Sequence, residues 1–118
     1  MGRDNLLKTK SYAFALQVLK TWKLLITKRI PFEIAGQFVR SGTAIGALIR
    51  EAEHAESKRD FVHKLSISLK EANECDYWIV LLHSSAFLAD ENAALLQSDL
   101  TEIIKILTAS LRTLKSRA

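Results

Sequence analysis

The chain contains few cysteines, which cross-link a protein, and few prolines and glycines, which interrupt helices. Of its 118 residues, one is cysteine, one is proline and four are glycine, and there is also a single methionine. The single Cys75 cannot form an internal disulfide, which argues against a secreted disulfide scaffold and favours a reducing compartment. Charged residues interrupt every apolar stretch before it reaches the about 18 residues of a membrane span. No basic and apolar leader opens the chain. We therefore expect a cytoplasmic protein that does not associate with membranes.

Acidic residues are scarce in the first quarter of the chain. Residues 1–29 carry seven lysines and arginines but a single acid, Asp4, although the net charge of the whole chain is only +4. Residues 90–118 instead place their acids first and their bases last, an order that complements a helix macrodipole. The basic excess of the first segment has no such explanation.

Apolar residues recur at helical spacing along the whole chain, and strand-like alternation is absent. Pro31 separates the first two helices, because the residue before a proline leaves the α region and proline itself opens a helix well. Ser57 is expected to cap the third helix. The spacing predicts a single domain, 1–118, with helices at about 4–28, 31–54, 57–84 and 90–115. Since short connections make neighbouring helices antiparallel, the predicted fold is all-α, an up-down-up-down four-helix bundle.

The second predicted helix carries three of the four glycines, Gly36, Gly42 and Gly46. A glycine inside a helix costs about 1 kcal/mol relative to alanine, so three on one helix indicate that another element approaches its backbone closely. The inner positions of this helix follow the heptad spacing of a bundle. They are Ala35, Phe38, Gly42, Ile45, Ile49 and Ala52.

The third predicted helix has more apolar residues than one buried stripe needs. Tyr77, Trp78 and Leu81 lie outside its inner stripe, whereas a bundle helix normally buries one stripe and exposes the opposite face. Surplus apolar residues on the first and fourth helices point the same way. We expect a homo-oligomer with Tyr77, Trp78 and Leu81 in its interface. The alternative is an irregular monomer whose loops cover this region.

Two carboxylate-x-x-histidine pairs, Glu51 with His54 and Asp60 with His63, resemble part of a di-iron bundle site. Such a site also needs an inward carboxylate from each of the other two helices, and the first helix offers only Asp4 at its start. Cys75 has no neighbouring base to activate it, and no glycine-rich phosphate loop is present. We therefore expect no enzyme, no metal and no cofactor, and interpret the paired motifs as solvated helix-end charges.

Basic residues from the two ends of the chain should meet in an up-down bundle, because the first helix starts where the fourth helix ends. They are Arg3, Lys8, Lys10, Arg112, Lys115 and Arg117. Repeated around a ring of subunits, they would form a surface suited to sequence-independent contacts with RNA or DNA phosphates. No base-reading motif accompanies them. The alternative is a set of charges that serves solubility alone.

Residues 38–52 (FVRSGTAIGALIREA) and 57–78 (SKRDFVHKLSISLKEANECDYW) resemble the signature of the small four-helix-bundle proteins encoded within 23S ribosomal RNA intervening sequences. The resemblance is close over the second and third helices and extends to the outer helices only in character. The matching motif positions are Arg40, Ser41, Gly42, Gly46, Arg50, Glu51, Phe61, Leu65, Glu71 and Glu74. Family members often carry asparagine where Leu48 stands, so a polar role at that position does not transfer.

The resemblance implies a closed ring, typically a homopentamer, with no established catalytic residues. A related branch serves beside reverse transcriptases in diversity-generating retroelements, where a basic surface contacts nucleic acid. We expect the charged motif residues Arg40, Arg50, Glu51, Glu71 and Glu74 to form a polar network that fixes the register of two helices. The rival interpretation is that they line a small-molecule pocket. Two functional hypotheses follow: an oligomer that binds RNA, DNA or an RNA-associated protein such as a reverse transcriptase, or a protein-interaction scaffold with no nucleic-acid role.

Overall fold

The computed structural model describes residues 2–117, apart from the side chains of Arg3 and Asp4. Four α-helices make up most of this part of the chain, and it contains no strand: α1 (Gly2–Leu25), α2 (Phe32–Glu53), α3 (Lys58–Ser84) and α4 (Asp90–Ser116), with a short 3-10 turn, η1 (Ile26–Lys28), after α1. These bounds lie within a few residues of the predicted ones. The all-α prediction is confirmed.

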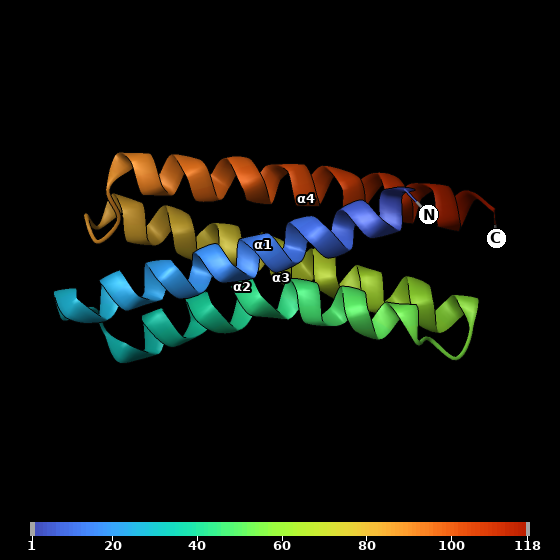
Figure 1. The fold of residues 1–118 in the computed structure, drawn as a ribbon, viewed down its shortest axis with the longest axis horizontal. Helices are drawn as coiled ribbons and strands as arrows, with labels where there is room; N and C mark the ends of the chain where they lie inside the picture. Colours follow the sequence, from blue (N-terminus) through green and yellow to red (C-terminus); the bar gives the residue numbers. More distant parts are fainter. Residues whose placement is uncertain (1, 118) are drawn as a thin grey trace.

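The four helices run side by side along one long axis, and the start of α1 and the end of α4 lie at the same end (Figure 1). The described part of the chain measures 47 × 22 × 19 Å. Helix α2 packs against α1 and α3, and α4 packs against α3 and α1. Helices α1 and α3 therefore occupy opposite corners of the bundle, as up-down-up-down connectivity requires.

The helix ends follow the local signals in the sequence. Ser57 caps α3, because its hydroxyl accepts the backbone N–H of Asp60 at 3.0 Å. The Asp60 carboxylate in turn accepts the backbone N–H of Glu56 at 3.2 Å, which completes a variant of the capping box. Before α2, Arg29 ends η1 in the left-handed conformation, with φ of 59°, and the Pro31 carbonyl accepts the backbone N–H groups of Ile34 and Ala35 in the first turn of α2.

The core lies along the inner seam of all four helices. Every inner position predicted for α2, from Ala35 to Ala52, is buried. The largest fully buried side chains are Leu7, Phe14, Leu25, Phe38, Ile45, Leu65, Ile79, Leu82, Leu96, Leu100, Ile103 and Leu107. Burial of this apolar stripe from each helix supplies the main driving force for folding.

The close approach predicted at the glycines is made by α1. A Cβ atom on Gly42 would lie 2.7 Å from Cγ2 of Val18, and one on Gly46 would lie 3.2 Å from Oγ of Ser11. Gly36 is different, since a Cβ there would meet nothing within 4 Å. Two of the three glycines therefore allow α1 and α2 to pack closely, and the third faces open space.

The surplus of apolar surface lies mainly on α1, not on α3 as the sequence predicted. Leu6, Tyr12, Leu16, Leu19, Leu24 and Ile26 are exposed large hydrophobic residues of α1 and η1. On α3, Leu82 belongs to the core and Trp78 and Leu81 are half-buried, while Tyr77 stays exposed. Neighbouring α2 and α4 cover flanks of α3 that periodicity alone assigns to the outside. No helix in the described residues is long and apolar enough to cross a membrane.

Candidate functional site

The basic residues predicted to meet at the terminal end of the bundle fall into two groups. Lys8 and Lys10 are paired with acids: Nζ of Lys8 lies 3.1 Å from Oε1 of Glu53, and Lys10 binds Glu102. Arg112 and Lys115 are exposed on the last turns of α4, and the exposed Arg117 follows its last residue. The side chain of Arg3 lies outside the described residues. Among the predicted bases whose side chains the structure describes, those without an ion pair therefore come from α4 and not from α1.

Two bases that the sequence prediction missed join them. Lys58 and Arg59, the first residues of α3, surround a hollow of about 400 Å³ together with Lys115 of α4, and Val62 and Leu114 complete its lining. We call Lys58, Arg59, Arg112, Lys115 and Arg117 the basic end. Among the described residues, none of these five forms an ion pair. Bases in the first turn of a helix oppose its macrodipole, and that is the signal that could have identified Lys58 and Arg59.

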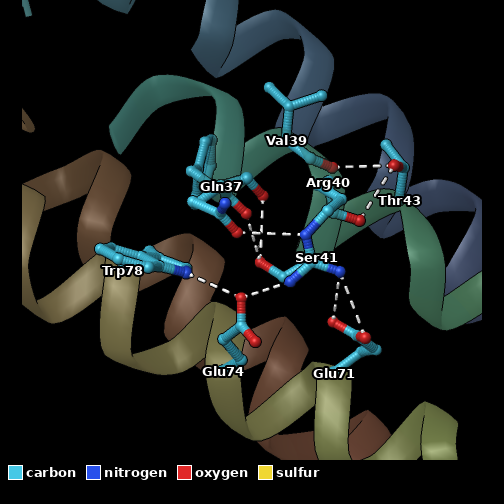
Figure 2. A network of polar contacts seen from close by, with 9 residues as sticks. Gln37, Val39, Arg40, Ser41, Thr43, Glu71, Glu74 and Trp78 are labelled. Atoms are coloured by element: carbon cyan, nitrogen blue, oxygen red, sulfur yellow. Dashed lines mark hydrogen bonds and ion pairs between the residues drawn. The ribbon is translucent and has the colours of Figure 1, made fainter. Parts of the chain in front are cut away.

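A second polar cluster bridges α2 and α3 near the middle of the bundle (Figure 2). The Arg40 guanidinium donates to both carboxylate oxygens of Glu71, at 3.1 and 3.2 Å, and to Glu74. Its Nε donates to Oε1 of Gln37 at 3.1 Å, and the Trp78 indole N–H donates to Glu74 at 3.1 Å. We call these five residues the polar seam. They supply the bridge between α2 and α3 that the sequence predicted.

The pKa shifts in the polar seam favour the charged forms of its ion-pairing residues, as expected for a structural contact. Hydrogen bonds from Trp78 and Arg40 lower the pKa of Glu74, and the Glu71 carboxylate raises the pKa of Arg40. The side chain of Glu71 is 16% exposed and that of Arg40 is 48% exposed. Nearby, burial raises the pKa of the Cys75 thiol to about 12. A thiol held in this form is not a nucleophile at neutral pH, so the cluster contains ionised partners but no activated group.

The other two charged motif residues do not join this seam. The Arg50 guanidinium lies 5.7 Å from the ring centroid of Tyr12, on the side of α2 that faces α1. Glu51 pairs with Lys64 of α3 at 3.0 Å. Both lie about three helical turns beyond Arg40, which is too far for one network. The single network expected from the sequence is therefore two separate α2–α3 contacts and one cation–π contact with α1.

The charged motif residues do not converge on a pocket. Arg40 borders a hollow of about 410 Å³ whose other lining residues are mainly apolar, and Glu71 and Glu74 do not line it. Among the side chains that the structure describes, no group of three or more histidine, cysteine, aspartate or glutamate residues could hold a metal ion. Glu51 is paired with Lys64, and Asp60 serves the start of α3.

Comparison with known proteins decides the family. The model of the 23S rRNA-intervening sequence protein family matches residues 3–109. The chain belongs to this family. A crystal structure of a protein of unknown function from the S23 ribosomal protein family of Bacteroides thetaiotaomicron has the same fold, with a TM-score of 0.89 and 43% identity over 93% of this chain and 98% of that one. No curated protein matches. The resemblance seen in two helices thus extends from α1 into α4.

The family motif residues divide by role in the structure. Ser41, Gly42, Gly46 and Leu65 serve packing: the first two are buried, Gly46 faces Ser11, and Leu65 lies in the core. The half-buried Phe61 packs against the same core. The charged motif positions hold α2 to α3, except Arg50, which contacts α1. All of these positions make contacts within the bundle, so the basic end remains the candidate for an interaction with another molecule.

Proposed function

We propose that the chain is a cytoplasmic, non-catalytic protein that assembles with copies of itself and binds RNA or DNA through its basic end. The observation that carries this proposal is the gathering of the five bases of the basic end from the start of α3 and the end of α4, without acidic partners among the described residues. Phosphate backbones bind such surfaces by releasing counterions. The family name also ties its members to 23S rRNA intervening sequences.

The position of Lys58 and Arg59 supports a role in binding. Basic residues in the first turn of a helix destabilise it by a few tenths of a kcal/mol or more, because the dipole there is positive. The free N–H groups of that turn add to the attraction for an anion. Of the acids at the same end, Glu53 pairs with Lys8 and Glu51 pairs with Lys64, Asp60 caps the start of α3, and Glu56 is exposed. The five bases of the basic end outnumber the exposed Glu56, which supports a positive potential there.

Recognition by this surface would not depend on base sequence. Its hollow is lined by the aliphatic side chains of Val62 and Leu114 and by three basic side chains, and it offers no aromatic ring for a base to stack upon. Charged side chains without base-edge contacts position a nucleic acid but do not read it. We expect single- and double-stranded RNA and DNA to bind with affinities that depend mainly on the salt concentration.

A matched pair of double variants tests the proposal. Lys58→Gln/Lys115→Gln removes two charges from the basic end, and Lys70→Gln/Lys105→Gln removes two exposed charges from the same helices elsewhere. Fluorescence anisotropy of a labelled RNA, titrated at several salt concentrations, should show binding weakened about tenfold by the first pair, with a salt slope lower by about one for each neutralised lysine. Equal affinities for the two double variants would remove the proposal.

A protein-interaction scaffold is the second candidate, and the exposed apolar surface of α1 favours it. Phe32, beside the end of α1, is 85% exposed, which is unusual for a side chain with no partner. An RNA-associated protein such as a reverse transcriptase is the partner class that the family resemblance implies. A stoichiometric partner that stays bound after nuclease treatment, combined with no RNA binding by the pure protein, would favour this candidate.

A further inference from the structure

A groove lies between the first half of α1 and the later half of α2, on the outside of the bundle. It encloses about 270 Å³, and its lining includes Ser11, Tyr12, Thr43, Gly46 and Arg50. We call these five residues the Tyr12 groove. Pockets that enclose a whole small molecule measure roughly 300–1,000 Å³. The Tyr12 groove therefore suits one flat ring that belongs to a larger partner.

Tyr12 and Arg50 give the groove the two kinds of side chain on which bases stack. Tyr12 is 56% exposed, and the Arg50 guanidinium lies 5.7 Å from the centroid of its ring. Unpaired bases stack on aromatic rings and on the planes of guanidinium groups, whatever the base, because every base has a π face. The groove therefore offers the stacking surface that the hollow of the basic end does not have.

The charge of Arg50 is available, unlike that of the other arginine of α2. Arg40 binds the carboxylates of Glu71 and Glu74. Arg50 is exposed and forms no ion pair with any carboxylate that the structure describes. A guanidinium group in this state can bind two phosphate oxygens at once. The groove thus places a phosphate-binding group beside a stacking ring.

The floor of the groove is open because Gly46 has no side chain. A Cβ atom there would lie 3.2 Å from Oγ of Ser11, so α1 comes close to the backbone of α2 at this point. The half-buried Thr43 donates its hydroxyl hydrogen to the carbonyl of Val39 at 2.8 Å, which leaves its oxygen free to accept a hydrogen bond. Base edges carry amino groups that donate such bonds.

The Tyr12 groove and the basic end lie toward the same end of the bundle. Arg50 stands three residues before Glu53, the last residue of α2, which is about 5 Å along the helix axis. Helix α2 ends where α3 begins and α4 ends (Figure 1), and Lys58 and Lys115 of the basic end occupy those two positions. A nucleic-acid strand on the basic end can therefore continue past the end of α2 into the groove.

We propose that the Tyr12 groove binds one unpaired base of a single-stranded RNA or DNA whose phosphate backbone lies on the basic end. The base stacks on the ring of Tyr12, and the Arg50 guanidinium binds a phosphate next to it. This inference rests on the proposed function and adds a preference that the basic end lacks. A base inside a duplex is stacked between its neighbours, so the groove adds affinity for single strands only.

Fluorescence anisotropy with a labelled single-stranded RNA, and with a duplex RNA of the same length, tests the groove. Tyr12→Ala should bind the single strand about tenfold more weakly than the wild type, because stacking is lost, and should bind the duplex with unchanged affinity. Tyr12→Phe keeps the ring and should bind both as the wild type does. Tyr77→Ala is the matched control, since Tyr77 is 59% exposed on α3, and it should change neither affinity.

Photo-cross-linking gives a readout that does not depend on how a variant folds. A single-stranded RNA that contains bromouracil is irradiated in complex with the wild-type protein, which is then digested with trypsin. Mass spectrometry should find the cross-link on the peptide of residues 11–20, which contains Tyr12. The same RNA annealed into a duplex should leave this peptide unlabelled.

The other outcomes separate this inference from the proposed function. A wild-type protein that binds neither RNA overturns the proposed function, and the groove with it. If the wild type binds both RNAs and Tyr12→Ala binds them equally well, or loses affinity equally for both, the groove is overturned and the basic end stands. A loss as large in Tyr77→Ala, or cross-links that all lie outside residues 11–20, also overturns the groove alone.

Discussion

Helix α2 contacts α1 through small residues and α3 through long polar ones. Toward α1, Gly42 and Gly46 let Val18 and Ser11 approach the backbone. Toward α3, Arg40 spans to Glu71 and Glu74 at the surface. At Gly42 the first contact has no room for another atom, while the second contact is made by flexible side chains in partial contact with water. The comparison indicates that a side chain added at Gly42 should perturb the bundle more than the loss of the surface polar contacts between α2 and α3.

Adding a side chain to the α1–α2 seam should have the largest effect. Gly42→Leu places four carbon atoms where a single Cβ would already lie 2.7 Å from Val18, a rigid and fully buried side chain. Because overpacking of a close contact is costly, we expect a loss of about 3 kcal/mol or more, enough to disrupt folding or assembly. Thermal unfolding followed by circular dichroism, with size measured by light scattering, checks this.

The smaller Gly42→Ala variant keeps the test quantitative if the leucine variant does not fold. It should still be destabilised, although alanine favours a helix by about 1 kcal/mol over glycine. A soluble Gly42→Leu protein of wild-type size and unchanged melting temperature would show that the seam is not tightly packed.

Removing the centre of the polar seam should have an intermediate effect. Arg40→Ala leaves Glu71 and Glu74 without their shared partner, but Arg40 is 48% exposed, so water screens much of the interaction. We expect a loss of about 1 kcal/mol in the free energy of unfolding, measured by urea denaturation. Lys70→Ala, a neighbouring exposed lysine of α3, is the control, and equal losses for the two variants would mean that the seam contributes nothing.

The glycine that faces open space should respond in the opposite direction. A Cβ atom at Gly36 would meet no atom within 4 Å, so Gly36→Ala gains helix propensity without a clash. We expect the free energy of unfolding to rise by about 0.5–1 kcal/mol. Destabilisation by this variant would contradict the distinction between Gly36 and Gly42.

The smallest effect concerns the pH dependence of the polar seam. Hydrogen bonding by Trp78, and then by Arg40, lowers the pKa of Glu74 below its ordinary value of 4.5. A carboxylate with a lowered pKa in the folded state stabilises the protein above the unfolded pKa, and this contribution is lost as the pH falls through the folded pKa. Glu74→Gln should therefore cost about 0.5 kcal/mol at pH 7. Paired urea titrations should show the difference shrinking as the pH falls below 4.5 and disappearing once it is below the folded pKa of Glu74, and a difference that persists in strong acid would assign it to packing.

The sequence predicted the helices and the inner face of α2 because both depend on spacing along one helix. Its heptad positions are all buried, and the caps at Ser57 and Pro31 are local signals. Whether the side chains on the flanks of α3 are buried could not be predicted. The burial of Leu82, Trp78 and Leu81 depends on how closely α2 and α4 approach α3. A one-dimensional pattern does not contain that distance.

The candidate site was predicted only in part for a related reason. Pairing of Lys8 with Glu53 and of Lys10 with Glu102 joins residues 45 and 92 positions apart. Such pairs depend on the axial register between helices, which periodicity does not specify. Lys58 and Arg59 were visible in the sequence, but their significance depends on the adjacency of the α3 start to the α4 end.

The burial of Cys75 means that the rate at which its thiol is chemically labelled reports how often the folded protein opens locally. The thiol is fully buried, and its pKa is raised to about 12, so a thiol reagent at pH 8 can react only during moments when α3 separates from its neighbours. The native labelling rate then counts these openings directly. Comparison with the rate in urea would tell whether the bundle opens helix by helix or only as a whole, without any engineered probe.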